Sequence, residues 1–392
     1  MSLEGNVSIS LLLAEQGVQQ AVVKSQRPLL AQALLVDTDA KDAPQKVGLV
    51  FNLCAKAQAY ASVYAIEQAC QNKASKDACG IRAQLVRMEL IREHLWRICL
   101  DWPELRGGQA EKALMKQVLL LDKEWEACLD ANHQAFVLAG DVKPPLKAKA
   151  SSIAMKLGTL LKEHIFYMPP KAFYECKSAE GYLLWAQYTQ MNVPQLIQSL
   201  VHRGWQGSGQ AETKVLPSFE LAWLDKALST DGAEGFMKQP TVGGAPCEST
   251  PYARQKNHPL LQELEKTYGV GLLTRFTAVL LELAATYLDL EKALMQFEAK
   301  CDAVGNAAEN TGFGAVEAAR GRLLHRVVLD EAQKVKTYQI VAPTEWNFHP
   351  DGVLKNALET LQGDETSIAQ QAKLLIHAMD PCVKFNLEIN HA

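Results

Sequence analysis

Two cysteines far apart in the sequence are the residues best suited to chemistry in this chain of 392 residues. Cys382 follows Asp380 and Pro381 at the end of an apolar run, and the proline predicts that a helix stops there. Cys54 precedes a helix-forming run over residues 55–69, where free N–H groups are expected to favour a thiolate. Both are therefore candidate metal ligands or nucleophiles, and the alternative is that each is a small buried apolar side chain.

Helices are predicted to form most of the scaffold that positions these cysteines. Apolar residues recur every three to four positions along several segments, which is typical of helices that pack on one face. These segments are residues 55–69, 81–102, 109–132, 147–164, 194–203 and 259–297. The middle of the chain is therefore expected to be a helical bundle.

β-Hairpins are predicted on both sides of this bundle. The first joins aliphatic and β-branched runs at residues 7–13 and 18–24, and the second joins residues 323–329 to 335–341. Residues 212–224 are a further candidate for short strands. The sequence thus predicts an α+β fold, mainly a helical bundle with N- and C-terminal β-hairpins. Its single domain, residues 1–392, would comprise a hairpin (1–36), a helical core (52–300), and a hairpin with the C-terminal cysteine motif (310–392).

Composition and short motifs exclude several functions. The net charge of −4 and the lack of a basic stripe make nucleic acid an unexpected partner. Neither a signal peptide nor an uninterrupted apolar span is present, so we expect a soluble, cytoplasmic protein without membrane association. The nine cysteines are odd in number and scattered, as expected where thiols stay reduced. Gly312 and Gly314 lack the third glycine of a phosphate-binding loop, so none is predicted.

Short blocks in a fixed order give the sequence a wider resemblance. The blocks are Leu3-Glu4-Gly5, Cys54 with residues 61–67, residues 248–254, residues 314–321, residues 338–347, and Asp380-Pro381-Cys382. In this order they resemble the large subunit of NiFe hydrogenases nearly from end to end. The last three blocks are the most specific, since the family reads E-A-P-R-G, Y-Q-x-V-x-P-T-x-W-N and D-P-C-x-x-C-x-x-H there. The resemblance implies a NiFe hydrogenase large-subunit-like fold.

The departures from the family pattern fall on its metal ligands. The family holds a nickel-iron centre with two C-x-x-C pairs, which the resemblance places at Phe51 with Cys54 and at Cys382 with Phe385. A phenyl ring ligates neither metal, and nickel needs soft thiolate ligands, so neither bound nickel nor enzyme activity is expected. Three further positions have lost a family arginine or histidine: Leu49, Gln58 and Glu388.

The sequence retains residues that, in the family, contact the ligands of iron. Arg320 and Thr344 match residues that contact the cyanide nitrogens in the family, and Ala342 and Pro343 lie beside Thr344. A guanidinium and a hydroxyl suit an anionic diatomic ligand. The alternatives are that Arg320 is an internal ion-pair partner, for example of Glu317, and that Thr344 caps the turn after Pro343.

Glu4 and Asp380 are expected to support the site without binding its ligand. Asp380 is expected to form a rigid corner that presents Cys382. Glu4 matches an acidic residue that the family associates with proton transfer, and without nickel it is expected to be structural; it is also a possible partner of Arg320. Three histidines within helical or strand patterns are expected to be satisfied core or surface residues: His94, His325 and His377.

This combination resembles the HupK/HoxV group of hydrogenase accessory proteins. The resemblance implies that Cys54 and Cys382 transiently hold an Fe(CN)2CO precursor during hydrogenase maturation. Hyp maturation chaperones would deliver the precursor, and the apo hydrogenase large subunit would receive it. A second hypothesis is a metal-free mimic of the large subunit that acts as a chaperone or partner-binding protein. A divergent active hydrogenase is the third, and Phe51 and Phe385 argue against it.

Overall fold

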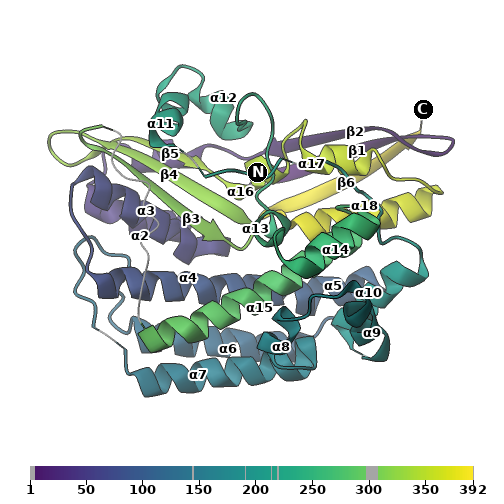
Figure 1. Cartoon of the computed structure of the whole chain (residues 1–392). Helices are drawn as coiled ribbons and strands as arrows, with labels where there is room; N and C mark the ends of the chain where they lie inside the picture. The colour runs from purple at the N-terminus through teal and green to yellow at the C-terminus, as the bar shows by residue number, and fades with distance from the viewer. Residues whose placement is uncertain are drawn as a thin grey trace.

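Two small β-sheets lie along one side of a helical bundle, as Figure 1 shows. This computed structural model describes residues 5–143, 145–189, 191–212, 214–218, 220–296 and 308–391. Helices make up 56% of it, which confirms the predicted α+β fold with a mainly helical bundle.

The first sheet joins the two ends of the chain. Strands β1 (Asn6–Ala14) and β2 (Gly17–Gln26) form the predicted N-terminal hairpin. Strand β6 (Lys384–His391) follows the cysteine motif and pairs parallel to β1, which gives the order β2-β1-β6. Alternate residues of β1 are buried, so one face of the sheet packs on the bundle. Strand β6 was not predicted, and it fixes the chain directly after Cys382.

The second sheet is an antiparallel meander of β3 (Thr311–Ala318), β4 (Gly321–Leu329) and β5 (Val335–Val341). The predicted second hairpin is confirmed as β4 and β5, whereas β3 was missed. Gly312 and Gly314 lie in β3 against helix α3, where an added Cβ would overlap the carbonyl oxygens of Ala65 and Ala61. These glycines therefore allow close packing of strand on helix, which explains why Gly-Phe-Gly stands there.

The predicted helices are present with some changes at their ends. The helices from residue 30 to residue 202 are α1 (Leu30–Leu35), α2 (Ala43–Val50), α3 (Ala55–Ala69), α4 (Lys76–Trp96), α5 (Trp102–Leu105), α6 (Lys112–Leu129), α7 (Lys147–Leu161), α8 (Pro170–Tyr174), α9 (Ala179–Tyr188) and α10 (Asn192–His202). Those that follow are α11 (Leu221–Ser229), α12 (Ala233–Lys238), α13 (Pro251–Gln255), α14 (Pro259–Tyr268), α15 (Leu272–Gln296), α16 (Pro343–Asn347), α17 (Val353–Leu358) and α18 (Glu365–Met379).

Three predicted segments differ from the helices and strands that the structure has there. The helix expected over residues 259–297 is divided into α14 and α15, because Gly269 adopts a positive φ of 70° and ends the first. Within residues 212–224 the described part forms only an isolated bridge between Val215 and Glu248 before α11 begins. The first hairpin ends at Gln26, and α1 occupies most of the remainder of residues 1–36.

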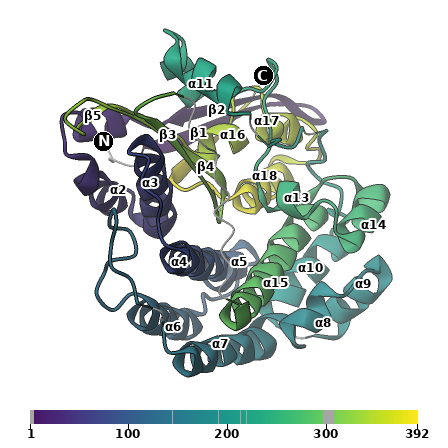
Figure 2. The same cartoon turned by 60° about the vertical axis from the view of Figure 1, so that its left-hand side comes forward.

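Helix α3 packs against the second sheet, and α4 lies next to α3 (Figure 2). Arg82 on α4 donates to both carboxylate oxygens of Glu67 on α3 at 2.8 Å, and both side chains are buried. Such a bidentate pair fixes the two helices relative to each other, because separating the partners would leave a buried charge unpaired. This pair holds the C-terminal end of α3 against α4, and at the end that carries Cys54 the backbone N–H groups of Lys56 and Ala57 donate to Glu89 of α4.

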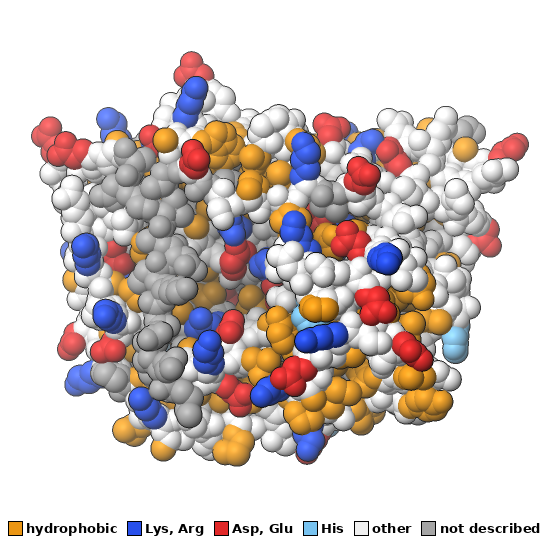
Figure 3. Space-filling model, viewed as in Figure 1, with side chains coloured by type: hydrophobic (Ala, Val, Ile, Leu, Met, Phe, Trp, Pro, Cys, Tyr) orange, Lys and Arg blue, Asp and Glu red, His pale blue; other side chains and the backbone are white. Residues whose placement is uncertain are grey.

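The surface and the cysteines complete this description. On the face shown in Figure 3, lysine and arginine side chains are interspersed with acidic ones. Across the described residues, no helix has both the length and the apolarity needed to cross a membrane. Cys79 is disulfide-bonded, so the expectation that all thiols are reduced was wrong for this residue.

Candidate metal site at the two cysteines

Cys54 and Cys382 share one site although they lie at opposite ends of the chain. Cys54 ends a short 3-10 turn and is the N-cap residue of α3, while Cys382 lies between the end of α18 and the start of β6. Burial is the main cause of the raised pKa of the Cys54 thiol, and the charges of Glu89 and Cys382 add to it. Charges on Cys382 and Cys54 in turn raise the pKa of Arg320. The structure therefore brings together the two cysteines that the sequence singled out.

The Asp380-Pro381 corner is fixed by two arginines. Asp380 ends α18 in the left-handed conformation with a φ of 50°. One carboxylate oxygen lies 2.5 Å from Arg97 Nε and the other lies 3.2 Å from Arg320 Nε. Arg97 also donates to the carbonyl oxygen of Pro381 at 3.1 Å. Burial opposes ionisation, but the two guanidinium groups outweigh it and hold the pKa of Asp380 below its usual value. This corner presents Cys382 at a defined position.

Cys54 is a protonated thiol, and the expected thiolate was a wrong prediction. Burial raises its pKa to about 12, and the nearby charge of Glu89 raises it further. Glu89 lies on α4 and accepts hydrogen bonds from the backbone N–H groups of Lys56 and Ala57, each at 2.9 Å. Since the first-turn donors of α3 bind this carboxylate, they do not stabilise a charge on the sulfur. Sequence gave no sign of this contact, because Glu89 lies on another helix.

A polar chain leads from Cys54 into the second sheet. Gln58 Nε2 donates to Cys54 Sγ at 3.7 Å, and Gln58 Oε1 lies 2.8 Å from Nε2 of His325. The other ring nitrogen, Nδ1, lies 2.8 Å from the hydroxyl of Tyr338. With the amide assigned this way, His325 donates to Gln58 and accepts from Tyr338. Burial lowers the pKa of His325 to about 3, so the ring is neutral. Gln58 thus orients the Cys54 sulfur.

The other two histidines also have partners away from the sulfurs. His94 Nε2 lies 2.8 Å from Glu282 in the core. His377 packs edge-on against Phe385 and lies 3.8 Å from Asp101. Among the described residues, no three His, Cys, Asp or Glu side chains are grouped as a metal site. The described part of the protein therefore offers the two thiols as its soft donors here.

Thr344 contacts Cys382 directly. Its Oγ1 lies 2.7 Å from Cys382 Sγ, and either atom can be the donor. Helix α16 begins at Pro343, follows Ala342, and has no side-chain cap, so the alternative of a turn-capping hydroxyl was wrong. Ala342, Pro343 and Thr344 are all buried. The block of residues 342–344 therefore forms a wall beside the sulfur.

Arg320 is held by two carboxylates that sequence analysis did not pair with it. It is buried in the turn between β3 and β4, where Nη2 lies 3.1 Å from Glu93 and Nε lies 3.2 Å from Asp380. Glu317 instead pairs with Arg322 at 2.6 Å, so the suggested pair between Arg320 and Glu317 was wrong. Strand register explains this, because Glu317 and Arg322 are opposite each other in the β3–β4 pair. Nε is the buried nitrogen of Arg320 that has no hydrogen-bond partner among the described residues, although it lies at ion-pair distance from Asp380.

Arg27 is a site residue that sequence analysis missed. It follows the end of β2, and its Nη1 lies 3.9 Å from Cys382 Sγ. Its guanidinium carbon lies 5.1 Å from the ring centre of Phe51. An arginine before a proline at a strand end has no chemical signature in sequence; the contact arises because β2 and β6 belong to one sheet.

The positions that depart from the family pattern have different surroundings. Phe51 is half-buried under Arg27, and Phe385 lies in β6 beside His377. Leu49 on α2 is 75% exposed, and Glu388 is exposed on β6. The two exposed residues do not line the site. Glu4 lies outside the described residues.

Part of the sequence and the whole fold are similar to those of nickel-dependent hydrogenases. The family described as nickel-dependent hydrogenase matches residues 270–385. The Ni-Fe-Se hydrogenase from D. vulgaris Hildenborough in the reduced state has a similar fold, with a TM-score of 0.66 and 19% identity over 95% of both chains. The enzyme from Desulfomicrobium baculatum gives a TM-score of 0.66 and 18% identity, also over 95% of both. The fold is that of a hydrogenase large subunit, as predicted.

Curated relatives of this chain are named as hydrogenase expression/formation proteins. The chain is 27% identical to the hydrogenase expression/formation protein HupK of Azotobacter vinelandii, over 100% of both chains. It is 28% identical to the expression/formation protein HupV of Azotobacter chroococcum mcd 1, over 100% of both. It is also 26% identical to HoxV of Cupriavidus necator, which is named in the same way, over 93% of this chain and 92% of that one. The predicted resemblance to the HupK/HoxV group is confirmed.

Proposed function

We propose that this protein is an accessory protein of hydrogenase maturation that transiently holds an Fe(CN)2CO precursor through Cys54 and Cys382. Relatives similar over the full length are named hydrogenase expression/formation proteins, which supports the accessory role. The observation that carries the iron proposal is the pair of thiols at one site in a hydrogenase-like fold, with Thr344 against one sulfur. Two thiols suffice for an iron that brings three ligands of its own.

The chain's residues would contribute donors, protons and orientation. Cys54 is protonated while the site is empty and gives up its proton on ligating iron, because a metal ligand must be a thiolate. The hydroxyl of Thr344 has one proton, which it donates either to Cys382 or to a cyanide nitrogen. Arg320 has further N–H groups for the same purpose, beyond the Nη2 that donates to Glu93. The carboxylates of Glu93 and Asp380 orient this guanidinium.

Nickel has no place in this proposal. A nickel site of the hydrogenase kind needs four soft thiolates, and phenyl rings at positions 51 and 385 leave two. The partners are the Hyp maturation chaperones as donors and the apo hydrogenase large subunit as acceptor. The names of the relatives support a connection with the maturation machinery. Ligand exchange and the loss of the Cys54 proton to solvent are the chemical steps required of the protein itself.

Infrared spectroscopy tests the proposal. The protein is purified anaerobically from a host with active Hyp machinery, and bands of metal-bound cyanide and carbonyl are expected. Cys54→Ala is expected to abolish both the bands and the bound iron without unfolding the protein, because its replacement removes one of two ligands. Cys70→Ala is the matched control, since that free thiol contacts Gln333 away from the site. A Cys54→Ala protein that keeps its full iron content would refute the two-thiol site.

A metal-free mimic of the large subunit is the second candidate. It is favoured by the ion-pair cluster of Arg320, Glu93, Asp380 and Arg97, in which each charge has an opposite charge beside it without any ligand. Absence of cyanide and carbonyl bands in a host with active maturation factors, together with co-purification of a hydrogenase subunit, would establish this alternative.

A further inference from the structure

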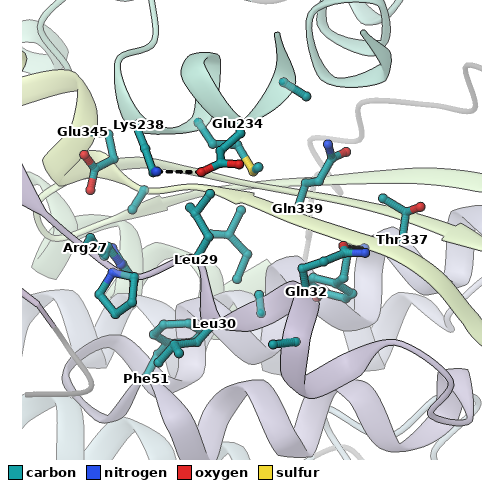
Figure 4. Close-up of a pocket in the computed structure, with 18 residues that line it drawn as sticks. Arg27, Leu29, Leu30, Gln32, Phe51, Glu234, Lys238, Thr337, Gln339 and Glu345 are labelled. Carbon is teal, nitrogen blue, oxygen red and sulfur yellow. Dashed lines mark hydrogen bonds and ion pairs between the residues drawn. The ribbon is translucent and has the colours of Figure 1, made fainter. Parts of the chain in front are cut away.

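Two cavities meet at Arg27, next to Cys382. The first encloses about 500 Å³ between α1, β5 and α12, and the second encloses about 690 Å³ beside β2 and β6. Figure 4 shows the first, with Phe51 and Arg27 at one end and Lys238 paired with Glu234 on the far wall. The residues that line both cavities are Arg27, Pro28, Lys238 and Glu345. Arg27 thus connects open space with the sulfur.

Arg27 differs from the other arginines around the site. Among the described residues it has no carboxylate within ion-pair distance, whereas Arg320 and Arg97 each have at least one at 3.2 Å or less. Its neighbours are the Phe51 ring and the Cys382 sulfur. Glu345 lines the same cavities but accepts a hydrogen bond from Ser25 at 3.2 Å. The guanidinium lies over an aromatic face and donates one hydrogen bond, from Nη1 to the Cys382 sulfur, so its remaining N–H groups are available to a ligand.

We propose that Arg27, stacked on Phe51, forms a binding site for small anions at Cys382 and is reached through the two cavities. A guanidinium with free donors binds anions by charge-assisted hydrogen bonds, and its position 3.9 Å from the sulfur places such an anion beside the thiol. The proposed function enters only in identifying the natural anion as the cyanide-bearing iron unit. The anion site itself depends on Arg27 and the cavities alone.

This arrangement also discriminates between metals. A fixed positive charge beside Cys382 repels a bare divalent cation and attracts a unit whose outer atoms are anionic. Phe51, which stands where the related enzymes have a cysteine, is the residue that supports this charge. The same substitution that removes a soft ligand therefore provides the platform for a cation.

The rates of two alkylating reagents test the proposal without iron. Iodoacetate is an anion and iodoacetamide is neutral, yet both alkylate the same thiolate, so the ratio of their rates at Cys382 reports attraction of an anion. The rates are measured by mass spectrometry of the Cys382 peptide in folded protein at low salt. Arg27→Gln is expected to lower the iodoacetate-to-iodoacetamide ratio by about tenfold, the effect of one unit charge at a half-buried site. Arg27→Lys keeps the charge and is expected to keep most of the ratio.

The wild-type protein supplies a second measurement that needs no variant. Raising the salt concentration from 0.01 M to 1 M is expected to lower the ratio at Cys382, because the screening length falls from about 30 Å to about 3 Å. The ratio at Cys70 serves as the internal control. A ratio at Cys382 that is insensitive to both salt and Arg27→Gln overturns the anion site. Failure of both reagents to reach Cys382 overturns it too. Neither result bears on iron content in Cys54→Ala, so the two proposals can fail separately.

Discussion

Replacing Asp380 by asparagine is expected to destabilise the protein at neutral pH and to release the corner that presents Cys382. Asp380 is buried between Arg97 and Arg320, with its carboxylate oxygens 2.5 Å and 3.2 Å from their Nε atoms. Removing one partner of a buried ion pair costs about 3–5 kcal/mol, because the other charge is left buried. Each arginine keeps another carboxylate, Asp101 or Glu93, so the lower end of that range, about 3 kcal/mol, applies.

The pH dependence follows from the pKa of Asp380. Its pKa is lower in the folded protein than in the unfolded chain, since the two arginines outweigh the cost of burial. The carboxylate therefore contributes its full stability above the unfolded value of about 3.9, and this contribution disappears as pH falls through the folded value. The difference between wild type and Asp380→Asn is expected to be constant from pH 6 to pH 8 and to vanish in acid.

Thermal unfolding followed by circular dichroism measures this difference. For a chain of this length, about 3 kcal/mol corresponds to a fall of about 4 °C in melting temperature. Asp231→Asn is the control, because that residue lies exposed in a turn, and less than 1 °C of change is expected. Equal melting temperatures for wild type and Asp380→Asn at pH 7 would show that the corner is not held by this ion pair.

Two further predictions concern stability. Burial raises the pKa of Glu345 to about 7, so the stability that its neutral form contributes is present below the unfolded value of about 4.3 and is lost as pH rises through 7. Glu345→Gln is therefore expected to gain in melting temperature over wild type between pH 5 and pH 8, and a constant difference would contradict this. Gly314→Ala is expected to cost about 3 kcal/mol, because the new methyl group meets the carbonyl of Ala61 on α3. Gly235→Ala on α12, where nothing lies within 4 Å, is the control and is expected to be neutral or slightly stabilising in the same unfolding assay.

Sequence reasoning succeeded where structure is determined locally. The helix over residues 55–69 was predicted with the bounds that α3 has, because its alanine-rich stretch carries a strong local signal. The first hairpin was likewise predicted from alternating runs around a glycine turn. Strand β6 was missed because its inward-facing residues are only half-buried at the edge of a sheet, so the alternation is weak.

The two cysteines of the candidate site could be predicted from the sequence, but the charges around them could not. Cys54 and Cys382 were found because they stand in motifs, and Asp380 was found because it precedes a proline. Glu89 and Arg27 determine the charge around the sulfurs, but they come from α4 and from the end of β2. Contacts between residues so distant in the chain are set by tertiary packing, which leaves no local pattern. The thiolate prediction failed for this reason.

The parallel pairing of β6 with β1 has a consequence for biosynthesis. Asn6 is opposite Lys384, so the sheet that holds Cys382 joins residues separated by nearly the whole sequence. While the ribosome is still adding residues 384–391, β1 and β2 have no third strand and Cys382 has no fixed position. Contacts of such long range form late, because loop-closure entropy must be overcome first. The two thiols therefore come together only after strand β6 has been translated, and any cargo they hold is loaded after that point.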